Sequence, residues 1–90
     1  MTTDEIKTLI EAGIESAQVK VSGDNGMYDA VVISDQFEGL STVKKQQMVY
    51  ATVNTQITSG AIHALTIKAY TPAEWETASK LQVGGSFQIN

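Results

Sequence analysis

One segment, residues 62–75, constrains the fold of this chain more than any other, because its hydrophobic periodicity changes abruptly within it. From Ile62 to Tyr70, apolar and polar side chains alternate as in a β-strand with one buried face. The next residues, Thr71-Pro72-Ala73-Glu74, have the sequence of a helix start: a capping residue, a proline in the first turn and a carboxylate three residues after the cap. The segment therefore predicts a strand that leads directly into a helix over about residues 72–81.

The same strand holds the only histidine of the chain. Alternation places His63 on one face with Leu65, Ile67 and Ala69. Because the chain has no cysteine, His63 is its only strong ligand for a transition metal. On residue type alone, however, a single histidine is more often structural or simply exposed than a ligand.

Helical and strand patterns also account for the rest of the chain up to this segment. Thr2 and Glu5 have the spacing of a capping box, and Asn25-Gly26 is typical of a tight hairpin turn. The predicted elements are a helix over about residues 3–16, two hairpin strands over 19–22 and 28–33 with the loop at 23–27, and two short helices over about 42–51 and 52–58, joined near Ala51.

This order of elements, αββααβα, predicts an α+β fold. We expect a two-layer sandwich in which helices cover the apolar face of a three-stranded mixed sheet. A chain of 90 residues has room for one domain, which we place at residues 1–82. Residues 83–90 contain Gly84-Gly85-Ser86 and no periodic pattern, so we expect a flexible C-terminal tail.

Composition excludes several classes of function. The net charge of −4 has the wrong sign for a protein held to nucleic acid by its overall field. With one histidine and no cysteine, the chain offers no nucleophile–base pair, so we do not expect an enzyme or a small-molecule substrate. No apolar run approaches the ~20 residues of a membrane span, and residues 1–10 lack the pattern of a signal peptide. We therefore expect a soluble, cytoplasmic protein with no membrane partner.

Lys44 and Lys45, together with Lys68, are candidates for a small basic patch in this acidic chain. A phosphate contact is one interpretation of such a patch. A solvated helix face is at least as common, so the residues alone leave both interpretations open.

Several motifs together resemble the BolA family, and most closely its IbaG branch, also called YrbA. The matching stretches are Phe37-Glu38-Gly39-Leu40-Ser41, Val43-Lys44-Lys45-Gln46-Gln47 with Val49-Tyr50, Ile62-His63-Ala64, and Lys68-Ala69-Tyr70-Thr71-Pro72-Ala73-Glu74-Trp75, with a weaker match at Val21-Ser22-Gly23-Asp24. The resemblance covers about residues 3–81. It implies a fold similar to a class II KH domain, in which the two middle helices form an element like a helix-turn-helix.

The resemblance also implies a function. Members of this family are expected to act as non-catalytic adaptors in iron–sulfur cluster trafficking and iron homeostasis, in partnership with a monothiol glutaredoxin. A 2Fe–2S cluster is then shared between the two proteins, with thiolates from the glutaredoxin and glutathione, and no cofactor is held by the adaptor alone. By position, His63 is the implied cluster ligand. Lys68, Tyr70 and Trp75 are the other residues we expect at the partner interface.

Two features of the resemblance leave alternatives open. Many members place a second histidine or cysteine in the first hairpin loop, whereas this loop has neither and offers only Met27, a weak ligand for iron. The family's links to stress response, including acid stress, and to the cell envelope also fit a DNA-binding regulator. In that alternative, Lys44 and Lys45 on the middle helices would contact DNA.

Overall fold

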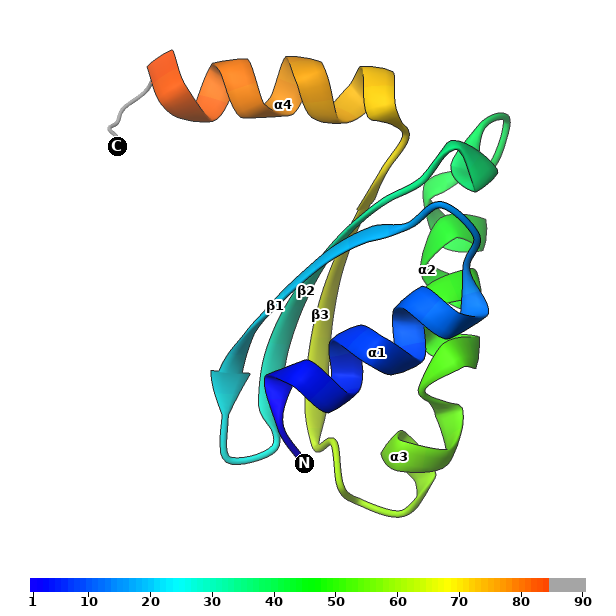
Figure 1. The fold of residues 1–90 in the computed structure, drawn as a ribbon, viewed down its shortest axis with the longest axis vertical. Helices are drawn as coiled ribbons and strands as arrows, with labels where there is room; N and C mark the ends of the chain where they lie inside the picture. The colour runs from blue at the N-terminus through cyan, green and yellow to red at the C-terminus, as the bar shows by residue number, and fades with distance from the viewer. Residues whose placement is uncertain (85–90) are drawn as a thin grey trace.

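Three strands form one mixed sheet in this computed structural model, which describes residues 1–84 (Figure 1). The elements are α1 (Thr3–Gly13), β1 (Gln18–Asp24), β2 (Met27–Ile33), the 3₁₀ turn η1 (Asp35–Phe37), α2 (Thr42–Thr52), α3 (Asn54–Thr58), β3 (Ala64–Tyr70) and α4 (Pro72–Gly84). The sheet order is β1-β2-β3, with β1 antiparallel and β3 parallel to β2. The predicted α+β class, the αββααβα order and the mixed sheet are confirmed; the likeness to a KH domain stays a prediction.

The hydrophobic core lies between one face of the sheet and helices α1 and α2. Cross-strand neighbours on this face include Val19 opposite Val32, and Tyr28 opposite Leu65. The buried core residues are Ile6, Ile10, Ile14, Val19, Tyr28, Ala30, Val32, Phe37, Val49, Val53, Ile62, Leu65 and Ile67. These residues come from all three strands, both long helices before β3 and the loops between them, so the sheet face and the helices stabilise one another.

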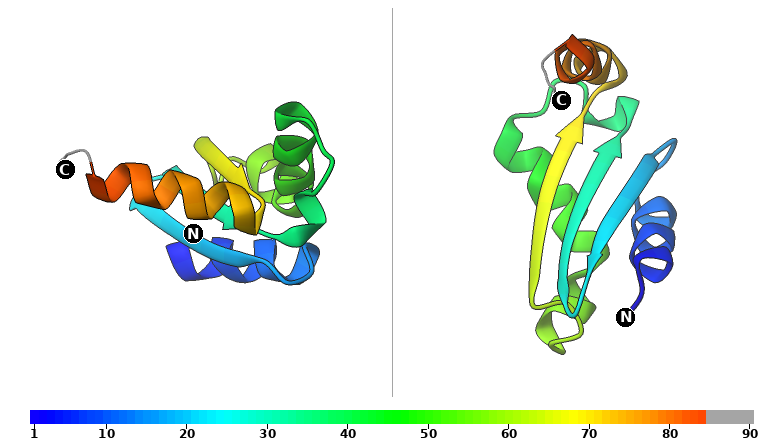
Figure 2. Two further views of the ribbon diagram at one scale, coloured as in Figure 1. Left: turned by 90° about the horizontal axis from the view of Figure 1, so that it is seen from above. Right: turned by 90° about the vertical axis from the view of Figure 1, so that its left-hand side faces the viewer.

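Helix α4 departs from the expected two-layer arrangement. Figure 2 shows α1, α2 and α3 on one side of the sheet, whereas α4 crosses the end of the sheet and extends past the opposite face. The start of α4 is held by the capping box that the sequence predicts, because the Glu74 N–H donates to Thr71 Oγ1 at 3.1 Å and the Thr71 N–H donates to Glu74 Oε1 at 2.8 Å. The expectation that helices only cover the apolar face is therefore wrong for α4.

Several predicted boundaries shift for local reasons. Helix α1 ends at Gly13 and not near Ser16, because Ile14 is extended and Ser16 has a φ of 58°. The hairpin loop contains only two residues, Asn25 and Gly26, with φ values of 53° and 81°. Positive φ at both positions is the signature of a type I′ turn.

The remaining differences concern the second half of the chain. The junction of the two middle helices lies at Val53 and not near Ala51. Strand β3 begins at Ala64, so Ile62 and His63 precede it. Helix α4 continues to Gly84, beyond the predicted end at residue 81. Most of the predicted tail, residues 85–90, lies outside the described residues.

The contact between α1 and α2 yields a test of the packing. A Cβ atom added to Gly13 would lie 2.5 Å from Thr52 Cγ2. We therefore expect Gly13→Ala to lower the free energy of unfolding by about 1–3 kcal/mol through overpacking, although alanine has the higher helix propensity. Urea unfolding of the variant measures this change. In the background of Thr52→Ser, which lacks Cγ2, the same substitution should cost clearly less, and only the 3.1 Å contact with the Cβ of residue 52 remains. An equal loss in both backgrounds would contradict the packing argument.

Candidate functional site

His63 lies at the entrance to β3, beside the hairpin loop. Its backbone N–H donates to the Gly26 carbonyl oxygen at 2.7 Å, and the next N–H, from Ala64, donates to the same oxygen at 3.0 Å. The side chain is exposed. Two hydrogen bonds to one carbonyl therefore hold the backbone that carries the imidazole, while the ring itself stays accessible to solvent.

Gly26 also determines where the imidazole ring lies. An added Cβ on this glycine would be 3.0 Å from Cγ and 3.1 Å from Nδ1 of His63. These contacts show that the ring packs closely against the loop backbone. Glycine suits position 26 for two reasons: it tolerates the positive φ of 81°, and it leaves space for the imidazole ring. Because the loop lies against Nδ1, Nε2 is the nitrogen farther from this contact.

Met27 is the other predicted ligand at this end of the sheet. It follows Gly26, pairs in register with Ala64 on β3, and is 64% exposed. Its thioether therefore lies near the loop that contacts His63, in a position open to solvent. A thioether is a soft but weak ligand, which makes Met27 at most a supplement to the imidazole.

The donor set at this site fits a shared metal centre better than a resident one. Among residues 1–84, no group of three or more histidine, cysteine, aspartate or glutamate side chains is placed to hold a metal ion. A 2Fe–2S cluster needs four protein or small-molecule ligands. One imidazole can complete a set whose thiolates come from elsewhere, so the described residues are compatible with a cluster held jointly with a partner.

The position of His63 corrects one sequence-based expectation. We expected His63 to share a face with Leu65, Ile67 and Ala69. Leu65 and Ile67 are buried in the core, whereas His63 is exposed and lies before the strand begins. The alternation of the strand does not extend to His63 because the chain there still follows the turn that leads out of α3.

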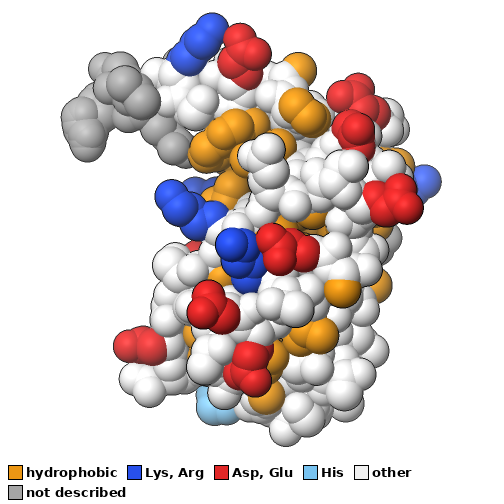
Figure 3. All heavy atoms as spheres, in the orientation of Figure 1, with side chains coloured by type: hydrophobic (Ala, Val, Ile, Leu, Met, Phe, Trp, Pro, Cys, Tyr) orange, Lys and Arg blue, Asp and Glu red, His pale blue; other side chains and the backbone are white. Residues whose placement is uncertain are grey.

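The other predicted partner-binding residues lie at the opposite end of β3. The rings of Tyr70 and Trp75 are paired, with centroids 5.4 Å apart and planes tilted by 56°, and Lys68 is exposed. Since a strand rises about 3.3 Å per residue, roughly 20 Å separates this end from His63. Figure 3 shows the histidine at the lower end of the molecule and α4 at the upper end. The structure therefore does not bring the four predicted residues into one cluster.

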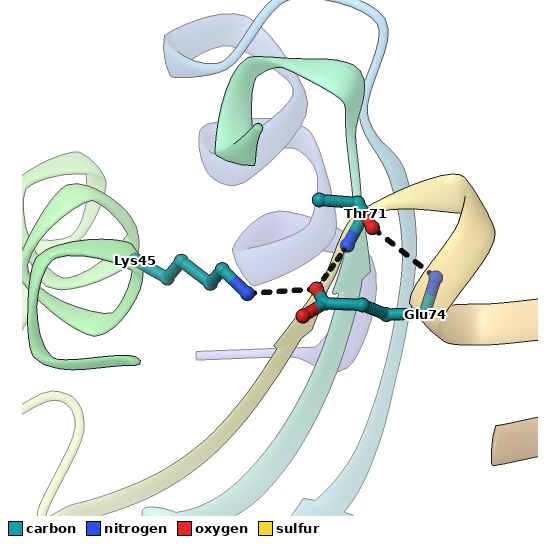
Figure 4. Close-up of polar contacts among 3 residues, drawn as sticks. All are labelled: Lys45, Thr71 and Glu74. Carbon is teal, nitrogen blue, oxygen red and sulfur yellow. Dashed lines mark hydrogen bonds and ion pairs between the residues drawn. The ribbon is translucent and has the colours of Figure 1, made fainter. Parts of the chain in front are cut away.

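Lys45 and Glu74 form an ion pair that links α2 to α4 (Figure 4). Lys45 Nζ donates to Glu74 Oε1 at 2.7 Å, and that oxygen also accepts the hydrogen bond from the Thr71 N–H. The Lys45 side chain is 8% exposed and that of Glu74 is 49% exposed. The hydrogen bond from Lys45 and the one from the Thr71 backbone hold the pKa of the Glu74 carboxyl below its usual range.

This pair changes the interpretation of the predicted basic patch. Lys44 is exposed, as expected for a solvated helix face, but Lys45 is buried and its charge is paired. The expectation of a patch that contains both lysines and Lys68 is therefore wrong for Lys45. Sequence reasoning assigned Glu74 only to a helix cap and could not detect its partner, which is 29 residues away in sequence.

The contact between Gly26 and His63 can be tested by substitution. Gly26→Ala should displace the imidazole and strain the turn, because the new Cβ meets the ring and the residue keeps a positive φ. We expect large changes in the NMR shifts of the His63 ring protons and a loss of about 1 kcal/mol or more in stability. Gly39→Ala is the matched control, since Gly39 also has positive φ but nothing lies within 4 Å of its added Cβ. Ring shifts that respond equally to both variants would contradict the contact.

The Lys45–Glu74 pair predicts a pH dependence of stability. Because the pKa of Glu74 is lower in the folded state, its contribution to stability is complete above the unfolded pKa, about 4.3, and is lost as the pH falls through the lower folded value. Urea unfolding should therefore show a stability difference between wild type and Glu74→Gln at neutral pH that shrinks below that range. Glu76→Gln, which removes an exposed pair with Lys80, should change stability little at either pH. A difference that stays constant on acidification would refute this account.

Comparison with known proteins places this geometry in a family. Residues 7–74 match the BolA family, described as "BolA-like protein". The acid stress protein IbaG of Escherichia coli K12 is 41% identical over 81 residues, which cover 90% of this chain and 96% of that protein. An uncharacterised protein of Acinetobacter guillouiae, from its rpoN-murA intergenic region, is 42% identical over 79 residues, or 88% and 95% of the two chains.

Solved structures show the same fold. A BolA homologue from Coxiella burnetii has a TM-score of 0.76 and 38% identity, with coverage of 84% of this chain and 97% of that one. Yeast Fra2 has a TM-score of 0.69 and 27% identity, with coverage of 96% of each chain. With the family match over most of its length, the identity to IbaG and the shared fold, this chain belongs to the BolA family.

Proposed function

We propose that this protein is a non-catalytic adaptor in iron–sulfur cluster trafficking and iron homeostasis. It binds a monothiol glutaredoxin and supplies His63 to a 2Fe–2S cluster whose thiolate ligands come from the glutaredoxin and glutathione. Support comes first from membership of the BolA family. The observation that carries the proposal is the exposed His63 imidazole, held on an anchored backbone without enough neighbouring ligands among residues 1–84 to bind a metal alone.

The chemistry of the ligand suits a shared cluster. A neutral imidazole binds iron through one nitrogen, and the contact of Gly26 with the Cγ–Nδ1 side of the ring favours Nε2 for this role. Replacement of a thiolate by an imidazole removes negative charge from the cluster and raises its reduction potential. Met27 is exposed, directly follows Gly26 and pairs in register with Ala64, which makes it the candidate for an additional weak contact.

A second part of the proposal concerns the partner interface. Partly exposed aromatic groups beside a charged residue are common in protein interfaces. Lys68 and the Tyr70–Trp75 pair offer such groups, but at the end of β3 away from His63. A partner that uses both ends must therefore extend along the whole of β3.

DNA binding by the helix pair is a weaker alternative. Helix α3 has only five residues, and Lys45 is buried against Glu74, which leaves Lys44 as the exposed lysine on α2. One exposed lysine provides a small part of the phosphate contacts that a DNA-binding protein requires. No specific observation on residues 1–84 favours this function over the adaptor.

Reconstitution with a cluster-loaded monothiol glutaredoxin tests the proposal. His63→Ala should change the visible circular dichroism of the mixed complex and lower the fraction of cluster that is shared, because the imidazole ligand is lost. Thr8→Ala is the control, since Thr8 is exposed on α1, which packs against β1 and α2 and away from β3. A spectrum of the His63→Ala complex identical to that of wild type would remove His63 from the cluster; a change on Met27→Leu would assign Met27 to it.

A further inference from the structure

The outer edge of β3 carries main-chain groups with no strand beside them. In the parallel pairing with β2, Ala64 N–H donates to Gly26 and the Tyr70 carbonyl accepts from Ser34. Because N–H and C=O of one residue point to the same side of a strand and alternate along it, Ala64, Thr66, Lys68 and Tyr70 all face β2. The main-chain groups of Leu65, Ile67 and Ala69 therefore face away from the sheet.

The outward main-chain carbonyl of one of these three residues, Leu65, already accepts a hydrogen bond. The Tyr50 hydroxyl on α2 donates to the Leu65 carbonyl at 2.9 Å. This contact occupies the edge near the beginning of β3. Outside the strand ladder, the hydrogen bonds among residues 1–84 include none to the main chain of Ile67 or Ala69. Ile67 is 6% exposed, whereas Ala69 is partly exposed, so the open edge is limited to Ala69, near the end of β3.

A groove of about 640 Å³ lies beside this open stretch. Its walls are α2, the edge of β3 and the first turns of α4. The lining residues are Thr42, Lys45, Gln46, Ile67, Lys68, Ala69, Tyr70, Glu74, Thr77 and Ala78. An edge strand that ends in a groove between two helices is the geometry that accepts an added extended peptide.

The charged groups in the groove define the chemistry of such a peptide. Glu74 is paired with Lys45, so the exposed Lys68 supplies the net positive charge of the lining in a chain with a net charge of −4. Lys45 is 8% exposed, and among the described residues its ammonium group has one hydrogen-bond partner, Glu74 Oε1. An ammonium has three donors. Lys45 therefore has donors left for a carbonyl or carboxylate in the groove.

We propose that this groove binds an extended, acidic segment of a partner protein, which adds to the edge of β3 at Ala69. Hydrogen bonds to the N–H and the carbonyl of Ala69 would hold the segment, and its carboxylates would face Lys68 and Lys45. The site is distinct from the cluster ligand, because it lies at the other end of β3 from His63 and requires no metal. The groove includes Lys68 and Tyr70, so it belongs to the same end of β3 as the proposed partner interface.

Amide exchange of the isolated full chain is the first test. The Ala69 amide should exchange faster than those of Thr66, Lys68 and Tyr70, which face β2. Slow exchange of Ala69 that is independent of protein concentration would mean that the chain covers its own edge. Slow exchange that appears only at high concentration would mean that a second copy covers it. Either result would overturn the proposal.

Selection from a phage-displayed library of random linear peptides is the second test. The selected peptides should carry Asp or Glu, and their affinity should fall about five- to tenfold for Ala69→Pro, which removes one outward N–H without loss of a ladder hydrogen bond. Lys68→Gln should also weaken binding. Lys20→Gln is the matched control, because Lys20 lies on β1 in the same cross-strand row and outside the groove; His63→Ala should likewise bind normally.

The response of the selected peptides to Ala69→Pro decides whether the edge of β3 binds them. Peptides that bind this variant as tightly as wild type, or a selection with no enrichment, would rule the site out. If Ala69→Pro does not fold, N-methylation of alternate peptide amides provides the same test from the ligand side, since it should weaken binding only at the positions that face β3. The His63→Ala variant keeps the two proposals separate. If it still binds the selected peptides, the groove proposal holds even where the cluster proposal fails.

Discussion

The parallel pairing of β3 with β2 determines where the proposed functional groups lie. Because β3 runs in the same direction as β2, its first residues lie beside the turn that begins β2, and its last residues lie beside the chain that leaves β2. His63 is thereby placed against Gly26, and α4 starts at the far end of the sheet. An antiparallel β3 would exchange these two ends. The sheet order β1-β2-β3 leaves β3 as an edge strand, and its outward groups lie toward α2 and α4.

A single carboxylate connects local and long-range structure at the other end of β3. Glu74 completes the cap of α4 through Thr71 and also pairs with Lys45 on α2. A buried lysine needs such a partner, since an unpaired ammonium in this position would be costly to desolvate. The pair therefore orients α4 relative to α2 and shapes the groove between them. Helix α4 has few other contacts with the sheet, which makes this link important for its position (Figure 1).

Family membership and the geometry at His63 support different parts of the proposed adaptor function. The match over residues 7–74 places the chain among BolA proteins. This particular chain has no cysteine and one histidine. The arrangement of His63 beside Gly26 and Met27 suits the proposed role, because it offers one exposed ligand on an anchored backbone. Because Tyr70 and Trp75 lie at the other end of β3, a partner that contacts them and also shares a cluster at His63 must cover an extended surface.

The sequence by itself determined the elements whose signals are local. The capping boxes of Thr2–Glu5 and Thr71–Glu74, the Asn25-Gly26 turn and the alternation in β3 depend on neighbouring residues, so they were predictable. The boundaries near Ser16, Val53 and His63 were less predictable, because packing decides where a helix or strand ends. Only the tertiary structure decided which distant residues meet. The burial of Lys45 by Glu74, the contact of Gly26 with His63 and the open edge at Ala69 arise from strand direction and helix packing, which no local pattern encodes.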